Sequence, residues 1–290
     1  MNKTLYCIAV ALTTLSVLSM ASCSGERSAV GTREVVGGIP MITIPAGSFR
    51  MGYDYASGPQ GAETPSVYYP DEQPVHTVRV SAFRIGETEI TQRRYEAVMG
   101  DNPSAFRGDD LPVTNLGATQ ALLFCNKLSE ASGLEPCYDP GTGKVDFSKN
   151  GFRLPTEAEW EYACRAGTTT HFNTGDTAAV LDATGWYIKN SGGTSHPVAG
   201  KTPNAWGLYD MHGNVWEFCY DGFNDAYPFG DYPDEPVIDP KGHDNFNYRI
   251  MRGGGWFSEA SECRSAVRGK FWTGGGCNYL GFRVAQSVVD

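Results

Sequence analysis

The stretch NAWGLYDMHGNVWE, residues 204–217, decides the fold of this chain. Its glycines and asparagines stand between large aromatic rings, and neither the period of a helix nor that of a strand is present. Large rings can anchor a core that has little regular secondary structure. The segment therefore predicts an irregular, well-packed loop, which carries two carboxylates, Asp210 and Glu217.

The composition extends this prediction to the whole chain of 290 residues. The chain holds 35 Gly and 17 Pro, and glycine is well above its average usage of about 7%. Many turns and long loops are therefore expected. The net charge of −10 gives no electrostatic support for binding a phosphate backbone, which excludes nucleic acid as a partner.

Regular structure is expected mainly in the first half of the chain. Thr156 and Glu159 form a capping box behind Pro155, and Gly167 is placed to end the helix that follows. One α+β domain, spanning residues 36–290 and low in regular secondary structure, accounts for the pattern. Strands are expected at residues 41–44, 75–80, 83–85, 249–251 and 282–284, and further helices at 89–99 and 118–128.

The N-terminus resembles a lipoprotein export signal. An apolar run follows Lys3 and closes on Met20-Ala21-Ser22-Cys23, which is similar to the small-residue site that precedes a lipidated cysteine. We expect residues 1–22 to be a signal peptide, Cys23 to carry lipid, and residues 23–35 to be a tether. An ordinary signal peptide with a chance cysteine is the alternative. We expect the protein to be exported and anchored by its lipid to a membrane, at the cell surface on the outer membrane.

Six short motifs, each different, follow one another along the chain. They are IPAGSF at 44–49, ETEIT at 87–91, FRLPTEAEWEYA at 152–163, the 204–217 segment, RGGGW at 252–256 and GFR at 281–283. In this order they resemble the formylglycine-generating enzyme (sulfatase-modifying factor) family. The resemblance covers residues 36–290 and implies a C-type-lectin-like fold.

The same resemblance raises the question of catalysis. It implies that a cysteine pair, five residues apart after the Gly-Gly-x-aromatic motif, binds copper and uses oxygen to convert a substrate cysteine to formylglycine. The matching positions here are Ser258 and Cys263. A serine hydroxyl cannot replace a thiolate as a soft copper(I) ligand. No catalytic residue is therefore expected, and Cys263 is interpreted as a buried thiol or half of a disulfide.

The 204–217 segment also offers oxygen ligands that suit calcium. The resemblance implies a structural calcium site made by the side chains of Asp210 and Glu217 and the carbonyls of Gly213 and Val215. The alternative is that these groups satisfy the loop backbone without metal. No cofactor is required for the expected function, and structural calcium is the one candidate.

A second resemblance concerns residues 252–285. Their frame of Arg252–Trp256, Cys263–Ala266 and Leu280–Arg283 is similar to that of the proteins diversified by retroelements, such as treponemal variable surface lipoproteins. Those proteins change the positions between the frame residues, and the implied ligand-binding positions here lie in the same intervals. They are Phe257, Ser258, Glu259, Glu262, Val267, Gly269, Lys270, Phe271, Trp272, Cys277, Asn278 and Tyr279.

The expected function is therefore a lipid-anchored, non-catalytic binding protein for an unknown protein or surface ligand. The alternative is a copper-dependent formylglycine-generating oxidase or a related sulfatase-modifying enzyme. Iron-dependent sulfoxide chemistry would need a histidine-rich site, whereas the five histidines are scattered. If the binding hypothesis holds, Phe271, Trp272 and Tyr279 should gather on one solvent-facing surface.

Overall fold

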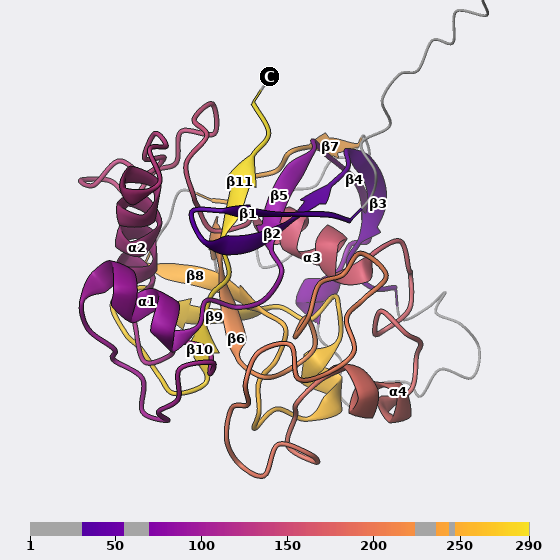
Figure 1. Cartoon of the computed structure of the whole chain (residues 1–290). Coiled ribbons are helices and arrows are strands. Elements are labelled where there is room, and N and C mark those ends of the chain that lie inside the picture. The colour runs from indigo at the N-terminus through magenta and orange to yellow at the C-terminus, as the bar shows by residue number, and fades with distance from the viewer. Residues whose placement is uncertain (1–30, 55–69, 224–235, 244–246, 290) are drawn as a thin grey trace, which may run out of the picture.

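The computed structural model describes residues 31–54, 70–223, 236–243 and 247–289 (Figure 1). The predicted signal peptide and Cys23 lie outside these residues. The described elements are α1 (Gln92–Met99), α2 (Ala118–Ala131), α3 (Glu157–Arg165), α4 (Ala178–Thr184), the 3-10 helices η1 (Pro70–Glu72) and η2 (Ala260–Cys263), and the strands β1 (Thr32–Val36), β2 (Ile39–Ile44), β3 (Gly47–Met51), β4 (His76–Val80), β5 (Phe83–Gly86), β6 (Trp216–Gly222), β7 (Val237–Ile238), β8 (Tyr248–Arg252), β9 (Gly269–Trp272), β10 (Leu280–Gly281) and β11 (Ala285–Ser287).

One sheet joins the two ends of the described chain. Its strand order is β1-β2-β5-β11, and all of its pairs are antiparallel. The expected tether is wrong over its last residues, because Thr32 already pairs with Thr43 and β1 continues to Val36. The alternation that marks β1 is weak, since its residues are mostly exposed, and an edge strand of this kind resembles a polar linker in sequence.

A second sheet carries the C-terminal segment, in the order β10-β6-β8-β9. β6 pairs with β10 in parallel and with β8 antiparallel, and β9 completes the sheet beyond β8. The sequence predicted a strand at 282–284, but these residues lie between β10 and β11, where the Phe282 and Val284 carbonyls accept hydrogen bonds from the backbone of Ile90 and Gly86 without forming a strand. The sequence also gave no sign of β9 or η2, because glycines and mixed polar residues obscure their periodicity.

The third sheet is small, with strand order β3-β4-β7. The helix α3 packs against β3, β4, β6 and β8, and all nine of its residues are buried. The predicted capping box is confirmed: Thr156 accepts a hydrogen bond from the Glu159 backbone, and Glu159 accepts one from the Thr156 backbone. Ala166, rather than Gly167, is the cap residue in the left-handed conformation.

Two large hydrophobic clusters form most of the core of the described residues, and a third, smaller one holds Phe172, Leu181, Tyr187 and Cys263. The first lies beneath α1 and α2, which occupy one side of the molecule in Figure 1, and includes Phe124, Phe218 and Phe282. The second surrounds α3 and includes Trp160 and Ile250. The predicted α+β architecture with long loops is confirmed, and β6, β8 and β9 bring residues 252–285 against both large clusters.

Candidate functional site: a frame of buried arginines and an aromatic face

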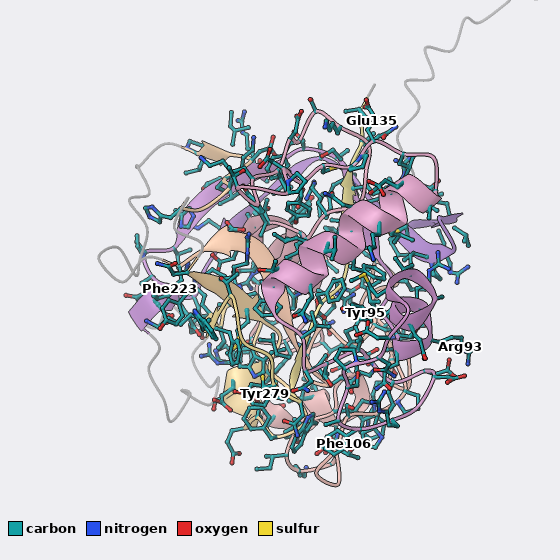
Figure 2. All side chains as sticks on the ribbon, turned by 90° about the vertical axis from the view of Figure 1, so that its left-hand side faces the viewer. Arg93, Tyr95, Phe106, Glu135, Phe223 and Tyr279 are labelled. Atoms are coloured by element: carbon teal, nitrogen blue, oxygen red, sulfur yellow. The ribbon has the colours of Figure 1, made fainter. Side chains whose placement is uncertain are left out.

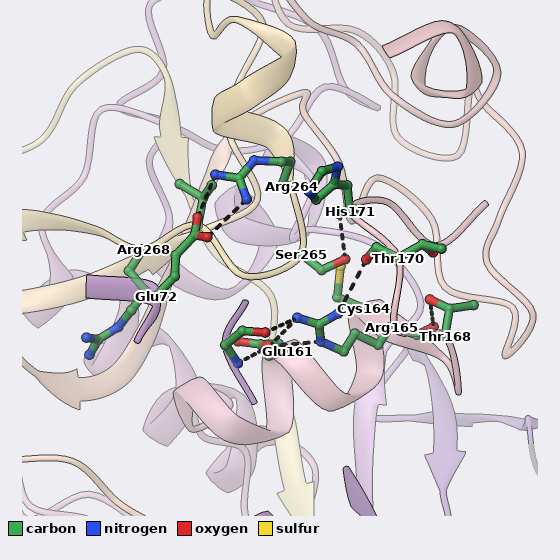
Figure 3. Close-up of polar contacts among 12 residues, drawn as sticks. Glu72, Glu161, Cys164, Arg165, Thr168, Thr170, His171, Arg264, Ser265 and Arg268 are labelled. Carbon is green, nitrogen blue, oxygen red and sulfur yellow. Dashed lines mark hydrogen bonds and ion pairs between the residues drawn. The ribbon is translucent and has the colours of Figure 1, made fainter. Parts of the chain in front are cut away.

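The frame of residues 252–285 is held by buried arginine–carboxylate pairs. Arg264 donates two hydrogen bonds to the Glu72 carboxylate, at 3.0 and 2.7 Å (Figure 3). Arg283 donates two to Glu217, both at 2.7 Å, and neither side chain is exposed. Such bidentate pairs fix geometry as well as charge. Each pair therefore ties the segment to a region of the chain far away in sequence.

The first frame residue, Arg252, is equally buried. It forms ion pairs with Glu157 and Glu161 of α3. Glu161 in turn accepts a hydrogen bond from Arg165, at 2.8 Å (Figure 3). The neighbouring arginines hold the pKa of Glu157 and Glu161 below their usual range, although burial opposes this shift more strongly than any single arginine favours it. These carboxylates remain charged and keep the segment attached to α3.

Aromatic rings form a continuous row across the segment. Trp256 contacts Phe257 with ring centroids 5.4 Å apart, Phe257 contacts Tyr279 at 4.5 Å, and Tyr279 contacts Phe271 at 6.4 Å. The row begins outside the segment, at Phe106, whose ring lies 5.6 Å from that of Trp256. Figure 2 shows Phe106 and Tyr279 toward the same end of the molecule. We call these five rings the aromatic face.

Trp272 lies apart from this row. On β9, Trp272 stands directly opposite Tyr248, whereas the preceding residue, Phe271, stands opposite Arg249. Successive side chains of a strand point to opposite faces of the sheet, so Trp272 and Phe271 point away from each other. Trp272 has an exposed fraction of 58%, while Phe271 and Tyr279 are half-buried. The expectation that all three gather on one surface is met only for Phe271 and Tyr279.

The twelve predicted binding positions therefore differ in their exposure. Ser258 and Val267 are buried, so their side chains do not reach solvent. Ser258 packs under Trp216, and Val267 belongs to the first core cluster. The exposed positions are Phe257, Glu259, Lys270 and Trp272, and the half-buried ones are Glu262, Gly269, Phe271, Cys277, Asn278 and Tyr279.

The predicted copper positions are both enclosed. The Ser258 hydroxyl accepts a hydrogen bond from Trp216 Nε1 at 3.1 Å. Cys263 is a free, fully buried thiol, and burial raises its pKa. A thiol with a raised pKa supplies little thiolate, which is the form that binds soft metals. The two side chains therefore do not form a copper site of the thiolate type.

The predicted calcium ligands give a divided result. Asp210 is buried, and its Oδ1 lacks a hydrogen-bond partner among the described residues. Glu217 accepts from Arg283 and, at 2.8 Å, from Trp160 Nε1. Its charge is thus already balanced. Within the described ranges no group of three or more acidic, histidine or cysteine side chains could hold a metal ion. That finding concerns side chains alone and does not bear on the carbonyls of Gly213 and Val215, so calcium binding stays a prediction.

Glu89 and Asp210 form a buried acidic pair that no sequence pattern indicated. Glu89 is 1% exposed and its carboxyl group lies against that of Asp210; as a carboxylate it finds no hydrogen-bond donor in the described part of the chain. Burial first, and then the charge of Asp210, raises the pKa of Glu89 well above its usual range. Burial also raises the pKa of Asp210, to about 6. Glu89 lies in the ETEIT motif, which indicated the family resemblance and not this buried position.

The remaining cysteines and histidines have structural surroundings. All six cysteines of the predicted domain are free thiols, and only Cys277 is not buried. His212 is fully buried, with Nδ1 2.8 Å from the Cys263 carbonyl and Nε2 accepting from the Asn173 backbone at 3.0 Å. Burial lowers the pKa of His212 to about 4. It is a packed core residue.

Other residues of the site could not be found from the sequence. Phe106 and Tyr248 lie outside the segment, and Glu72 is 192 positions before its partner Arg264. A hydrogen-bonded clamp also joins the segment to the start of α2: Asn115 donates to the Cys277 carbonyl at 2.8 Å, and Ala118 donates to the Thr273 carbonyl at 3.0 Å. These contacts join segments that are far apart in the sequence, and no local sequence motif marks them.

The architecture is that of a C-type-lectin-like fold of the formylglycine-generating type. The chain is similar to Treponema denticola variable protein 1, with a TM-score of 0.77 and 35% identity, over 89% of this chain and 99% of that one. It is 32% identical to "Chaperone protein LppX" of Paenibacillus barcinonensis, over 72% of this chain and 82% of that protein. It is 31% identical to the formylglycine-generating enzyme of Streptomyces coelicolor, over 85% and 89%.

The family follows from the match of residues 27–288 to the sulfatase-modifying factor enzyme 1-like domain. The chain belongs to this family. Both enzymes and a variable protein are therefore among its relatives, and the site must decide between them. No helix in the described ranges is long and apolar enough to cross a membrane.

Proposed function

We propose that this protein is a non-catalytic binding protein, anchored by lipid at Cys23, which presents a changeable ligand surface on residues 252–285. The ligand is a protein or another molecule of a cell surface. The aromatic face supplies the apolar contacts, and Glu259 is exposed two positions after Phe257. Lys270 and Trp272 are exposed on the opposite side of β9 and form a separate part of the proposed surface. Exposed aromatic residues are typical hot spots of protein interfaces.

One observation carries the proposal: frame and changeable positions alternate along the segment, and burial separates the frame arginines from every changeable position except Ser258 and Val267. Arg252, Arg264 and Arg283 are at most 2% exposed, whereas Phe257, Glu259, Lys270 and Trp272 reach solvent. A scaffold that keeps its internal pairs can tolerate changes at the exposed positions. This is the property that a diversified binding protein requires.

The alternative, a copper-dependent oxidase, finds little support. Ser258 cannot act as a thiolate, and its hydroxyl is engaged by Trp216. The Cys263 thiol is buried and has a raised pKa. An oxidase of the family type needs a reactive thiol pair that substrate and oxygen can reach.

The relatives support a binding role in different ways. One similar structure carries the description of a variable protein, and it aligns over almost its whole length. Another relative is described as a chaperone, and chaperones bind other proteins through exposed apolar surface. An aromatic face suits either kind of protein ligand.

The test is site-specific photocrosslinking in intact cells. A photoreactive amino acid replaces Phe257 or, as an exposed apolar control outside the segment, Ile238 of β7. We expect the Phe257 position to crosslink one defined partner and Ile238 to give none. Equal products from both positions, or no product from Phe257, would contradict the proposal.

Two further measurements address catalysis and diversification. The purified protein, supplied with copper(I) and a cysteine peptide, should form no formylglycine detectable by mass spectrometry. The neighbouring DNA should contain a near-copy of the codons for residues 252–285 that differs only at adenines, beside a reverse transcriptase gene. Turnover of the peptide would overturn the non-catalytic assignment, and absence of the near-copy would remove the diversification.

A further inference from the structure

The largest described cavity of this protein is separate from the aromatic face. It has a volume of about 500 Å³ and lies between α2 and the loop of residues 138–143. Small-molecule sites commonly have volumes of about 300–1,000 Å³. A second described cavity, beside Arg153 and Lys241, is about half as large, at 240 Å³. Figure 2 looks onto α2, which runs along this surface.

The helix presents an uncovered stripe to the cavity. Leu122, Leu123, Asn126 and Lys127 line one wall at helical spacing, so they share one side of α2. Leu123 has an exposed fraction of 48%, although its neighbour Leu122 is buried. The helix therefore leaves apolar surface open at the mouth of the cavity.

The opposite wall is held in place by its own hydrogen bonds. Asn126 donates to the Tyr138 carbonyl at 2.8 Å and accepts from the Tyr138 backbone at 3.0 Å, which locks the loop to α2. Asp139 Oδ1 accepts from the backbone of Gly141 and from the backbone and hydroxyl of Thr142. The cavity is thus preformed, and a ligand need not order it.

Positive charge lines the cavity at two depths. Arg249 is 1% exposed, and its Nη2 would lie 3.8 Å from a side-chain carbon at Gly143. Because Gly143 has no side chain, the Arg249 guanidinium can line the border of the cavity. Lys127 lies at the exposed rim. Arg249 Nη1 donates a hydrogen bond to the Tyr220 carbonyl, and burial lowers the pKa of Arg249, so an anion placed beside the guanidinium would add to its solvation.

The lining of the cavity also holds two carboxylates, those of Asp139 and Glu130. Asp139 Oδ1 is already used by three donors inside its own loop, and Glu130 is exposed at the rim. A ligand that enters the cavity therefore meets apolar walls and then a guanidinium.

We propose that this cavity, between α2 and residues 138–143, is a second binding site that takes a small amphiphilic carboxylate. The apolar body of the ligand packs against Leu122 and Leu123, and the carboxylate faces Arg249 and Lys127. The site is separate from the proposed protein-binding function and does not depend on it.

The test uses three probes of equal size with the full-length protein: 4-phenylbutanoate, 4-phenylbutanol and 4-phenylbutylamine. Equilibrium dialysis measures their affinities. Hydrogen bonds to charged groups are worth about 1.5–3 kcal/mol, so the carboxylate should bind about tenfold more tightly than the alcohol or the amine. Equal affinities, or no saturable binding of the carboxylate, would overturn the proposal.

Variants assign the binding to this cavity. Leu123→Glu should abolish it, and the matched control Ile188→Glu, at a similarly exposed apolar position, should leave it unchanged. Lys127→Gln should reduce the preference for the carboxylate over the alcohol. Binding that survives Leu123→Glu would place the ligand elsewhere. Crosslinking from Phe257 should be unaffected by Leu123→Glu, so this proposal and the proposed function can fail independently.

Discussion

Within residues 252–285, the frame residues and the residues of the surface differ in what holds them. Arg252, Arg264 and Arg283 are enclosed and paired with carboxylates of other elements. Phe257 and Trp272, a few positions away, are held by ring contacts or reach solvent. The stability of the segment and the chemistry of its surface therefore depend on different side chains.

The reason lies in the energetics of buried charge. A buried ion pair contributes little net stability compared with apolar residues, but removing one partner leaves an uncompensated charge. Glu217 cannot move to solvent when Arg283 is lost, because both side chains have no exposed surface. The frame therefore tolerates little change, whereas removal of Phe257 or Trp272 leaves no buried charge behind.

The largest effect is expected from Arg283→Ala. The substitution leaves Glu217 buried with only the Trp160 hydrogen bond, and it should lower the free energy of unfolding by about 3–5 kcal/mol. Urea unfolding followed by tryptophan fluorescence measures the change. Arg93→Ala is the control, since Arg93 is 62% exposed and pairs only with surface carboxylates, and it should cost about 0–1 kcal/mol. Equal effects of the two variants would remove the distinction between frame and surface.

The clamp between residues 273–277 and the start of α2 predicts an intermediate effect. A side-chain carbon at Gly276 would lie 2.5 Å from the backbone of Asn115. Gly276→Ala should therefore lower stability by about 1–3 kcal/mol. Gly141→Ala, where the nearest atom would be at 3.5 Å, is the matched control and should have a small effect. Full stability of Gly276→Ala would show that the clamp can open without cost.

A pH-dependent effect is expected at the buried acidic pair. The pKa of Glu89 is raised in the folded protein, mainly by burial, so the folded state holds a proton that the unfolded state loses above the usual value of 4.5. Stability should then fall as the pH rises from 4.5 toward neutrality. Glu89→Gln mimics the protonated form and should raise the free energy of unfolding at pH 7 by about 1–3 kcal/mol.

The comparison of unfolding at pH 5 and pH 7, with chelator present, measures this effect. The exposed Glu130→Gln is the control and should follow the wild type at both values. A Glu89→Gln variant that is no more stable than wild type at pH 7 would mean that the carboxylate has a partner in solution, of which a cation is one candidate.

Much of the fold could be predicted because its signals are local. The capping box of Thr156 and Glu159 marked the start of α3, and alternating residues marked β2, β4 and β5. The strands β9 and β11 could not be located, because a strand of three or four residues beside glycines has no readable period. The burial of Ser258 was likewise hidden, since it depends on Trp216 rather than on neighbours in sequence.

The site divides in the same way. The frame arginines were recognised from motifs, but their partners were not, because Glu72 and Arg264 meet only through the tertiary fold. The sequence placed Phe271, Trp272 and Tyr279 together, whereas strand geometry turns Trp272 toward Tyr248. Phe106 joins the aromatic face through a loop that hydrogen bonds of Gln92 hold in place. No sequence motif indicates the contact between Phe106 and Trp256.

The smallest effect is expected from surface substitutions within the same segment. Phe257→Ser and Trp272→Ser remove side chains with exposed fractions of 37% and 58%, and each should change the free energy of unfolding by about 0.5 kcal/mol or less. Val267→Ser is the contrasting control, because Val267 is 1% exposed and a hydroxyl there would lose apolar contacts and lack a partner, which should cost about 2 kcal/mol or more. Urea unfolding of the three variants measures the difference. If Trp272→Ser destabilises as much as Val267→Ser, the surface is part of the frame, and a changeable binding surface could not be built on it.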